Sequence, residues 1–126
     1  MSIPHVSPQR LAVKIKEHDT QRTIMGWLNV YGIFFWRNNT GVKIREATET
    51  QNRGFIRFGT PGAPDLFAIH AGKVYGIECK SPTGKQTEKQ KAFEQSFSGA
   101  GRGTCVYILA RSLEDVTEAI SLVARP

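Results

Sequence analysis

Two short apolar runs in the middle of the chain dominate its pattern of hydrophobic and polar positions. The first extends from Leu66 to His70 and the second from Val74 to Lys80, with the turn-like pair Ala71-Gly72 between them. Because strand side chains alternate between faces, the apolar residues fall on both sides of the resulting hairpin. One side carries Phe67, Ile69 and Val74, and the other carries Leu66, Ala68, Tyr75 and Ile77. The pattern therefore predicts a β-hairpin that is covered on both faces.

Helical and strand patterns flank this hairpin. Before the hairpin we expect a helix from Ser7-Pro8 to about Val30, either unbroken or interrupted near His18-Asp19, and then a strand from Ile33 to Arg37. After the hairpin we expect a helix from Thr87 to about Phe97 and a strand from Thr104 to Ala110. A last helix is capped by Ser112 and has one apolar face, formed by Leu113, Val116, Ile120 and Val123. Val42 to Phe58 fits either an extended ribbon or an irregular loop. The order predicts an α/β fold, with helices flanking a mixed sheet in three layers. In this sheet the first three strands form a meander and the last strand runs parallel to its neighbour.

The hairpin brings charged residues together if its turn has two residues. His70 then pairs with Lys73, and counting back sets Asp65 opposite Glu78, with Cβ atoms ~5 Å apart. Lys80 lies on the same face as Glu78. Two carboxylates at that distance repel unless a cation lies between them or one is protonated. A bulged turn would break this register and send the two acids to opposite faces.

These residues suit chemistry on a phosphate. Mg²⁺ prefers oxygen ligands and can activate a water, and a nearby lysine can orient that water or hold the phosphate. This part of the chain resembles the core of the PD-(D/E)XK nucleases. It has Pro64-Asp65, then twelve intervening residues, then Glu78-Cys79-Lys80. The surrounding residues resemble the virus-type replication-repair nuclease (VRR-NUC) family, and the likeness extends from about Glu17 onward. It is carried by residues 59–66 (GTPGAPDL), Ile77, Gly84-Lys85 and Gln90. The alternative, a turn aspartate beside a surface Glu78–Lys80 ion pair, is disfavoured because both faces of the hairpin look covered.

The resemblance implies a restriction-endonuclease-like α-β-β-β-α-β core and an endonuclease that hydrolyses DNA phosphodiester bonds with Mg²⁺ or Mn²⁺. Asp65, Glu78 and the backbone carbonyl of Cys79 would hold the ion, and Glu17 on the first helix would complete the site. Lys80 would position the attacking water. Without the resemblance, Glu17 is interpreted as a solvated glutamate on the helix surface. Gln90 fits two roles, a capping-box residue with Thr87 and a polar group that points at the cleft.

Charge and composition favour a nucleic-acid partner. The 126 residues suffice for one domain, residues 1–126, with a loose tail at residues 1–6, and the formal net charge is +6 with a pI near 9.6. The cations that we expect to contact DNA are Lys43, Arg45, Arg53, Arg57, Lys85, Lys89 and Lys91. Singly, each also fits a solvated surface. A basic nucleic-acid-binding module without catalysis is the alternative function, and the intact Asp, Glu and Lys set argues against it.

Further expectations concern assembly and location. Stand-alone members of the family are thought to act as homodimers on branched DNA such as four-way (Holliday) junctions, and the aromatic segment Tyr31 to Trp36 and the Val42 to Phe58 region are the candidate contact surfaces, although both also fit the core. Arg37-Asn38 resembles a family segment near the cleft, whereas the histidines have no metal-ligand spacing. Cys79 and Cys105 fit buried free thiols in a reducing compartment. The sequence has no membrane-spanning run and no signal-peptide pattern, so we expect a soluble cytoplasmic protein. The Gly99–Gly103 connector has no phosphate-loop motif, and we expect no small-molecule substrate.

Overall fold

The computed structural model describes residues 8–38, 41–45 and 54–120. Within them the elements are α1 (Pro8–Val30), β1 (Phe34–Arg37), β2 (Gly41–Arg45), β3 (Gly54–Phe58), β4 (Leu66–His70), β5 (Lys73–Cys79), α2 (Glu88–Gly101), β6 (Cys105–Ala110) and α3 (Leu113–Ala119). The loose tail predicted for residues 1–6 lies outside the described residues. No described helix is both long and apolar enough to cross a membrane.

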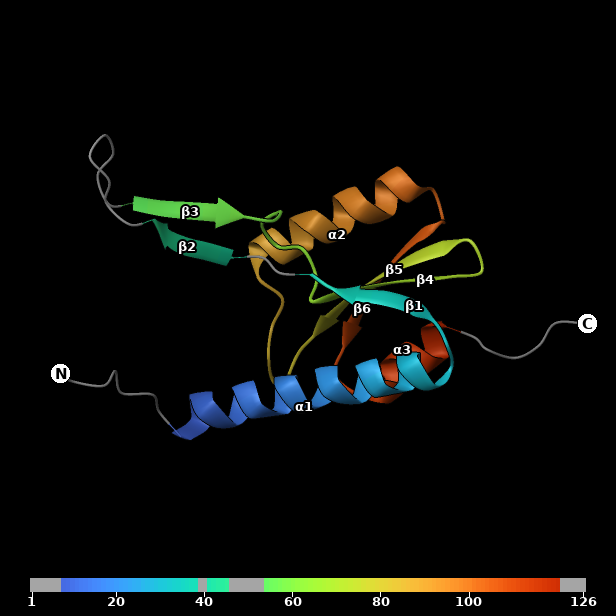
Figure 1. Ribbon diagram of the computed structural model, residues 1–126, viewed down its shortest axis with the longest axis horizontal. Helices are drawn as coiled ribbons and strands as arrows, with labels where there is room; N and C mark the ends of the chain where they lie inside the picture. Colours follow the sequence, from blue (N-terminus) through green and yellow to red (C-terminus); the bar gives the residue numbers. More distant parts are fainter. Residues whose placement is uncertain (1–7, 39–40, 46–53, 121–126) are drawn as a thin grey trace, which may run out of the picture.

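Four strands form one mixed sheet in the order β1-β4-β5-β6. β1, β4 and β5 make an antiparallel meander, and β6 runs parallel to β5 after the crossover through α2. Figure 1 shows α2 on one side of the sheet and α1 with α3 on the other. The predicted α/β class, the mixed sheet and its flanking helices are confirmed. The undecided segment after β1 contains a separate antiparallel hairpin, β2 with β3, that extends away from this sheet.

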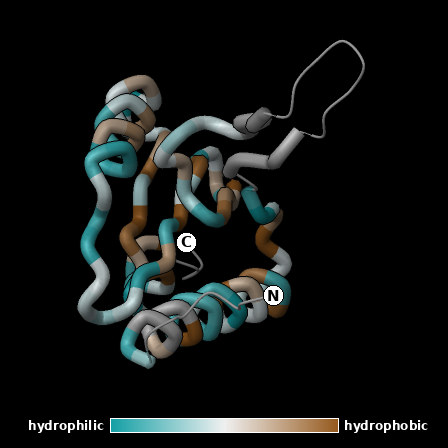
Figure 2. Tube along the Cα trace, turned by 90° about the vertical axis from the view of Figure 1, so that its left-hand side faces the viewer, coloured by the Kyte–Doolittle hydropathy of each residue, from teal (hydrophilic) through white to brown (hydrophobic). Residues whose placement is uncertain are grey.

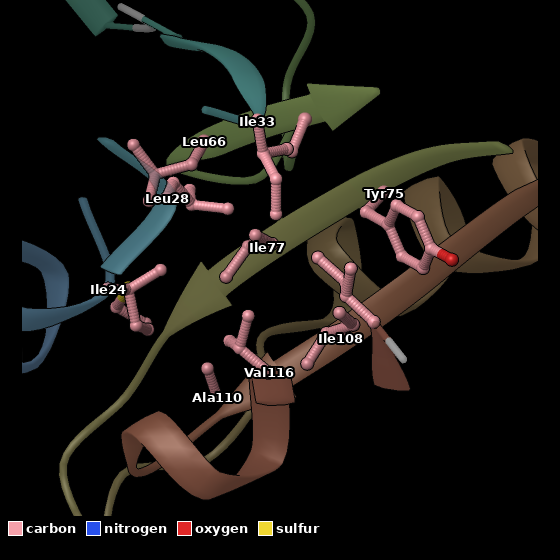
Figure 3. Close-up of a cluster of buried hydrophobic side chains, with 12 residues drawn as sticks. Ile24, Leu28, Ile33, Leu66, Tyr75, Ile77, Ile108, Ala110 and Val116 are labelled. Atoms are coloured by element: carbon pink, nitrogen blue, oxygen red, sulfur yellow. The ribbon is translucent and has the colours of Figure 1, made fainter. Parts of the chain in front are cut away.

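The main core lies between the sheet and the α1–α3 layer. Ile24 and Leu28 of α1 meet Leu66 of β4, Ile77 of β5 and Val116 of α3, and all five are fully buried (Figure 3). Burying one such side chain contributes about 1.5–3 kcal/mol to stability. In Figure 2 the hydrophobic positions gather on the strands between the helical layers. The alternation of the hairpin thus decides which residues face α1.

The opposite face of the sheet packs against α2 through aromatic rings. Phe67 of β4 contacts Phe93 and Phe97 of α2, with ring centroids 6.3 and 5.9 Å apart. Gly76 of β5 makes room for this layer, since a Cβ there would lie 3.3 Å from the Phe97 ring. Coverage is uneven, because Ile69 on the same face is 41% exposed. The expectation that the hairpin is covered on both faces holds only for its β5 side.

The structure decides three details of the helices that the sequence left open or placed differently. α1 continues unbroken through His18-Asp19, where neither glycine nor proline interrupts the helix. α2 extends to Gly101, so the connector to β6 is only residues 102–104, of which Arg102 and Gly103 have positive φ. Ser112 stands at the N-cap of α3 without a side-chain cap bond, because Asp115 Oδ2 instead accepts the Arg111 N–H at 2.8 Å. The predicted contribution of Val123 to α3 lies outside the described residues.

The two cysteines differ in their surroundings. Both are free, as expected, but only Cys79 is buried. Cys105 is half-buried at the start of β6, because the adjoining α2 ends beside it. Burial raises the pKa of the Cys79 thiol well above its usual range. Cys79 therefore stays a neutral thiol in the core near the site.

Candidate metal and phosphate site

The β4–β5 hairpin has the register that sets Asp65 opposite Glu78. His70 pairs with Lys73, and the pairing continues to Leu66 with Ile77, one step before the two acids. Ala71 and Gly72 both have positive φ, at 50° and 79°, as a two-residue type I′ turn requires. The even register predicted from the sequence is confirmed.

Asp65 is held by backbone groups from both neighbouring strands. Its Oδ2 accepts a hydrogen bond from the Cys79 N–H at 2.9 Å. Within a strand the N–H and C=O of one residue point the same way, so the Cys79 carbonyl is directed to the edge where Asp65 lies. On the other side, the Asn38 N–H donates to the Asp65 carbonyl at 2.8 Å, and Asn38 Nδ2 donates to the Pro64 carbonyl at 3.2 Å. Asn38 thus braces the segment that presents Asp65.

Glu78 is only 5% exposed and is held from α2. Gln90 Nε2 donates to Glu78 Oε1 at 3.0 Å, while Gln90 Oε1 accepts the Thr87 N–H at 2.9 Å. The Thr87 hydroxyl oxygen accepts the Gln90 N–H and completes the capping box. The two roles predicted for Gln90, helix cap and cleft group, are therefore combined in one side chain.

The two carboxyl groups resist ionisation together. Burial raises the pKa of Glu78 to about 8, and the nearby Asp65 carboxylate adds to that rise. Burial also raises the pKa of Asp65, against the opposing effects of the Cys79 N–H and the Lys80 charge. The Glu78–Asp65 pair therefore retains a proton near neutral pH unless a cation replaces it.

Both acids open onto a hollow of about 230 Å³ at the end of the sheet. Its lining residues are Glu17, His18, Gln21, Asp65, Glu78 and Cys79. Glu17 and Gln21 continue the α1 stripe of Ile24 and Leu28, which explains how the helix brings them here. This arrangement unites residues from α1, the β4 approach and β5.

Glu17 lines the acidic hollow without forming a compact cluster with the two facing acids. Among the residues that the structure describes, no three His, Cys, Asp or Glu side chains converge closely enough to hold a metal ion. The Glu17 carboxylate lies toward Gly84, with Oε1 3.5 Å from where a Cβ on Gly84 would stand. Repulsion from the two facing acids opposes a closer approach. The structure places the Glu17 carboxylate in the wall of the same hollow as Asp65 and Glu78, and its role as a further metal ligand stays a prediction.

Lys80 is half-buried at the end of β5, and the loop after it is tightly held. Arg111 Nη1 donates to the carbonyls of Ser81 and Gly84, each at 2.7 Å, and to that of Pro82 at 3.3 Å. Ser81 is buried, and its Oγ accepts the Gly84 N–H at 3.0 Å. Sequence reasoning assigned Arg111 no role. The available signal was an arginine directly after the buried strand that neighbours β5.

The predicted DNA-contacting cations are only partly placed. Lys85, Lys89 and Lys91 are exposed around the start of α2, as expected, and Lys91 pairs with Glu88 at 3.2 Å. Lys43 and Arg45 belong to β2 and Arg57 to β3, but their side chains are not described, and Arg53 lies outside the described residues. The lysines near α2 thus form the described part of this set.

Three basic residues also gather here, of which sequence reasoning gave His18 and Arg22 no role and placed Arg37 near the cleft only by resemblance. His18, Arg22 and Arg37 line a smaller hollow that adjoins the acidic one. His18 is close enough to Asp65 to favour its ionised form and lower its pKa. The spacing of His18 and Arg22, four residues apart on a helix, was the signal that could have grouped them.

No family model and no curated protein matches the chain. The nature of the site therefore rests on its geometry. The buried Glu78 faces the half-buried Asp65, with a backbone carbonyl at the same edge and a lysine directly after β5. This group suits a hard cation and a phosphate.

Proposed function

We propose that the protein is a divalent-metal-dependent DNA endonuclease of the PD-(D/E)XK type, similar to the VRR-NUC nucleases. The observation that carries the proposal is the half-buried Asp65 facing the buried Glu78, with Lys80 two residues further on the same face. The order α1, β1, β4, β5, α2, β6 around the mixed sheet supports a restriction-endonuclease-like core.

The donor set fits Mg²⁺ or Mn²⁺. Asp65, Glu78 and the Cys79 carbonyl supply oxygen ligands, and a cation would remove the repulsion that raises the pKa of Glu78 to about 8. Glu17 provides a further carboxylate in the wall of the hollow. Such an ion, when bound, supplies positive charge to the scissile phosphate and lowers the pKa of a coordinated water.

The chain's own residues hold this arrangement and complete it. Gln90 fixes the Glu78 carboxylate, and the Cys79 N–H fixes that of Asp65. Lys80 would hold the phosphate or orient the attacking water, and the loop clamped by Arg111 keeps the end of β5 in place. Mobility at the reacting centre is thereby limited before substrate arrives.

DNA is the proposed substrate, with branched DNA such as four-way junctions preferred. The net charge of +6 and the exposed Lys85 and Lys89 favour a polyanion. Cutting both strands of a symmetrical junction needs two matched sites, which a two-fold homodimer supplies. The exposed apolar residues Phe34, Trp36 and Ile69 on the open part of the sheet are the proposed dimer contact. The two free cysteines favour an intracellular protein.

A nicking assay tests the catalytic proposal. Plasmid and four-way junction DNA are incubated with the protein in Mg²⁺, Mn²⁺ or EDTA, beside the variant Glu78→Gln. We expect cleavage by the unaltered protein with either metal, and none in EDTA or with the variant. DNA binding without cleavage under every metal condition would favour the alternative, a non-catalytic binding module.

A further inference from the structure

The smaller hollow beside the acidic one has a cationic wall. Its volume is about 120 Å³, and its lining residues are His18, Gln21, Arg22, Met25 and Arg37. His18 and Gln21 also line the hollow that contains Asp65 and Glu78, so the two hollows adjoin. A ligand that spans both would meet acidic groups at one end and guanidinium groups at the other.

Two different elements bring the cations together. His18, Arg22 and Met25 follow one another at helical spacing on α1. Arg37 ends β1, and its neighbour Trp36 stacks on Phe67 on the α2 side of the sheet. Because strand residues alternate, Arg37 is directed to the α1 side.

No described carboxylate neutralises these arginines. Among the residues that the structure describes, the single ion pair is Lys91 with Glu88, and Asp19, one turn before Arg22, makes none with it. Two guanidinium groups on one small hollow repel each other, and an anion between them removes that repulsion. The planar guanidinium matches phosphate oxygens with paired hydrogen bonds.

We propose that this hollow binds a phosphate of the nucleic-acid strand, adjacent to the phosphate that is cut, with Arg22 and Arg37 as donors. The proposal rests on the endonuclease function and assigns the contact that sets the strand's position over Asp65 and Glu78. The hollow, of about 120 Å³, has room for a single phosphate group. The group is either a diester within the strand or a terminal monophosphate, which share the same oxygens.

Binding in EDTA tests the pocket without cleavage. Fluorescence anisotropy on a short labelled duplex, over a salt series, compares the unaltered protein with Arg22→Ala/Arg37→Ala. The control, Lys73→Ala/Arg102→Gly, removes the same charge at the opposite end of the sheet and suits the positive φ at position 102. We expect the log–log salt slope of the arginine variant to become shallower by about one, and its affinity to fall at least about tenfold. The control should keep the original slope.

A charge-conserving variant separates charge from packing. Arg22→Lys/Arg37→Lys should retain the slope while binding more weakly, because lysine lacks the paired donors. If the alanine variant does not fold, as judged by circular dichroism, Arg37→Gln at the exposed end of β1 gives the same comparison. If DNA binding by the arginine variant and by the control has the same log–log salt slope, the phosphate-binding role of this hollow is wrong.

The type of phosphate follows from duplexes with and without a 5′-phosphate. Tighter binding of the phosphorylated duplex by the unaltered protein, lost in the arginine variant, assigns a terminal phosphate, and equal binding assigns a diester. Failure of the two proposals can be told apart. If the unaltered protein neither binds nor cuts DNA, the endonuclease proposal is wrong. If it cuts DNA but the arginine variant binds like the control, only the phosphate-pocket proposal is wrong.

Discussion

The side-chain amide of Gln90 connects the start of α2 to the carboxylate of Glu78. Its Nε2 lies 3.0 Å from Glu78 Oε1, and its Oε1 lies 2.9 Å from the Thr87 backbone nitrogen. A helix cap and the orientation of a candidate metal ligand therefore depend on one residue. Stability and chemistry at this position can be separated because Thr87 shares only the first role.

Gln90→Ala and Thr87→Ala should destabilise the protein similarly, each by about 1 kcal/mol, since both break the capping box. Only Gln90→Ala should also reduce cleavage strongly, because only it frees Glu78. Urea unfolding and single-turnover cleavage measure the two effects. Equal cleavage rates in the two variants would remove Gln90 from the site.

The metal-free protein should lose stability as the pH rises from about 4.5 to about 8. The pKa of Glu78 rises from its usual 4.5 to about 8 on folding, so within this window the native state keeps a proton that the unfolded chain releases. The loss should be on the order of a few kcal/mol, measured by urea unfolding in EDTA.

Two controls belong to this pH series. Mn²⁺ should restore stability at pH 8 by replacing the proton, and Glu78→Gln should show neither the pH dependence nor the gain with Mn²⁺. A flat profile for the unaltered protein would mean that the carboxyl pair ionises freely.

Lys80→Ala should fold and bind DNA normally but cleave about 10²–10³-fold more slowly. The lysine is proposed to act on the attacking water or the phosphate, which matters chiefly in the transition state. Single-turnover rates at saturating protein isolate that step. Lys73→Ala, an exposed lysine at the opposite end of β5, is the matched control, and a Lys80 variant that cuts as fast as this control would exclude the lysine from the reaction.

Gly62→Ala should destabilise the protein more than Gly72→Ala. Both glycines have a φ of +79°, so each substitution carries the cost of a left-handed alanine, about 1–2 kcal/mol. A Cβ at Gly62 would also collide with the backbone carbonyl of Lys89, whereas the space at Gly72 is open. The extra loss at Gly62, measured by urea unfolding, should be accompanied by slower cleavage, because the loop that leads to Asp65 would move away from α2. Equal losses would show that the loop shifts at no cost.

The protein should form a homodimer that cuts four-way junctions in preference to linear duplex. Phe34, 67% exposed, and Trp36, 41% exposed, lie on the open part of the sheet. Phe34→Glu should give monomers in light scattering across a dilution series and lose paired cuts in the junction, while Val30→Glu, an exposed position at the end of α1, should not. A wild-type monomer that cuts linear duplex equally well would contradict this assembly.

The sequence was sufficient for features set by local rules. Alternation placed Leu66 and Ile77 on one face and Asp65 and Glu78 on the other, and the pair Ala71-Gly72 set the even register. The capping box of Thr87 was also readable, because it depends on residues only three positions apart. These elements are determined by backbone periodicity and turn chemistry.

Contacts between distant segments were decided by the tertiary structure. The union of both roles in Gln90 requires α2 to dock over β5, and the clamp of Arg111 on the Ser81–Gly84 loop joins positions about thirty residues apart. Glu17 reaches the acidic hollow only because α1 packs against β5. The cationic hollow of Arg22 and Arg37 likewise exists only because β1 ends beside α1. Periodicity determines which face a residue occupies, whereas packing and charge balance between elements determine what that face meets.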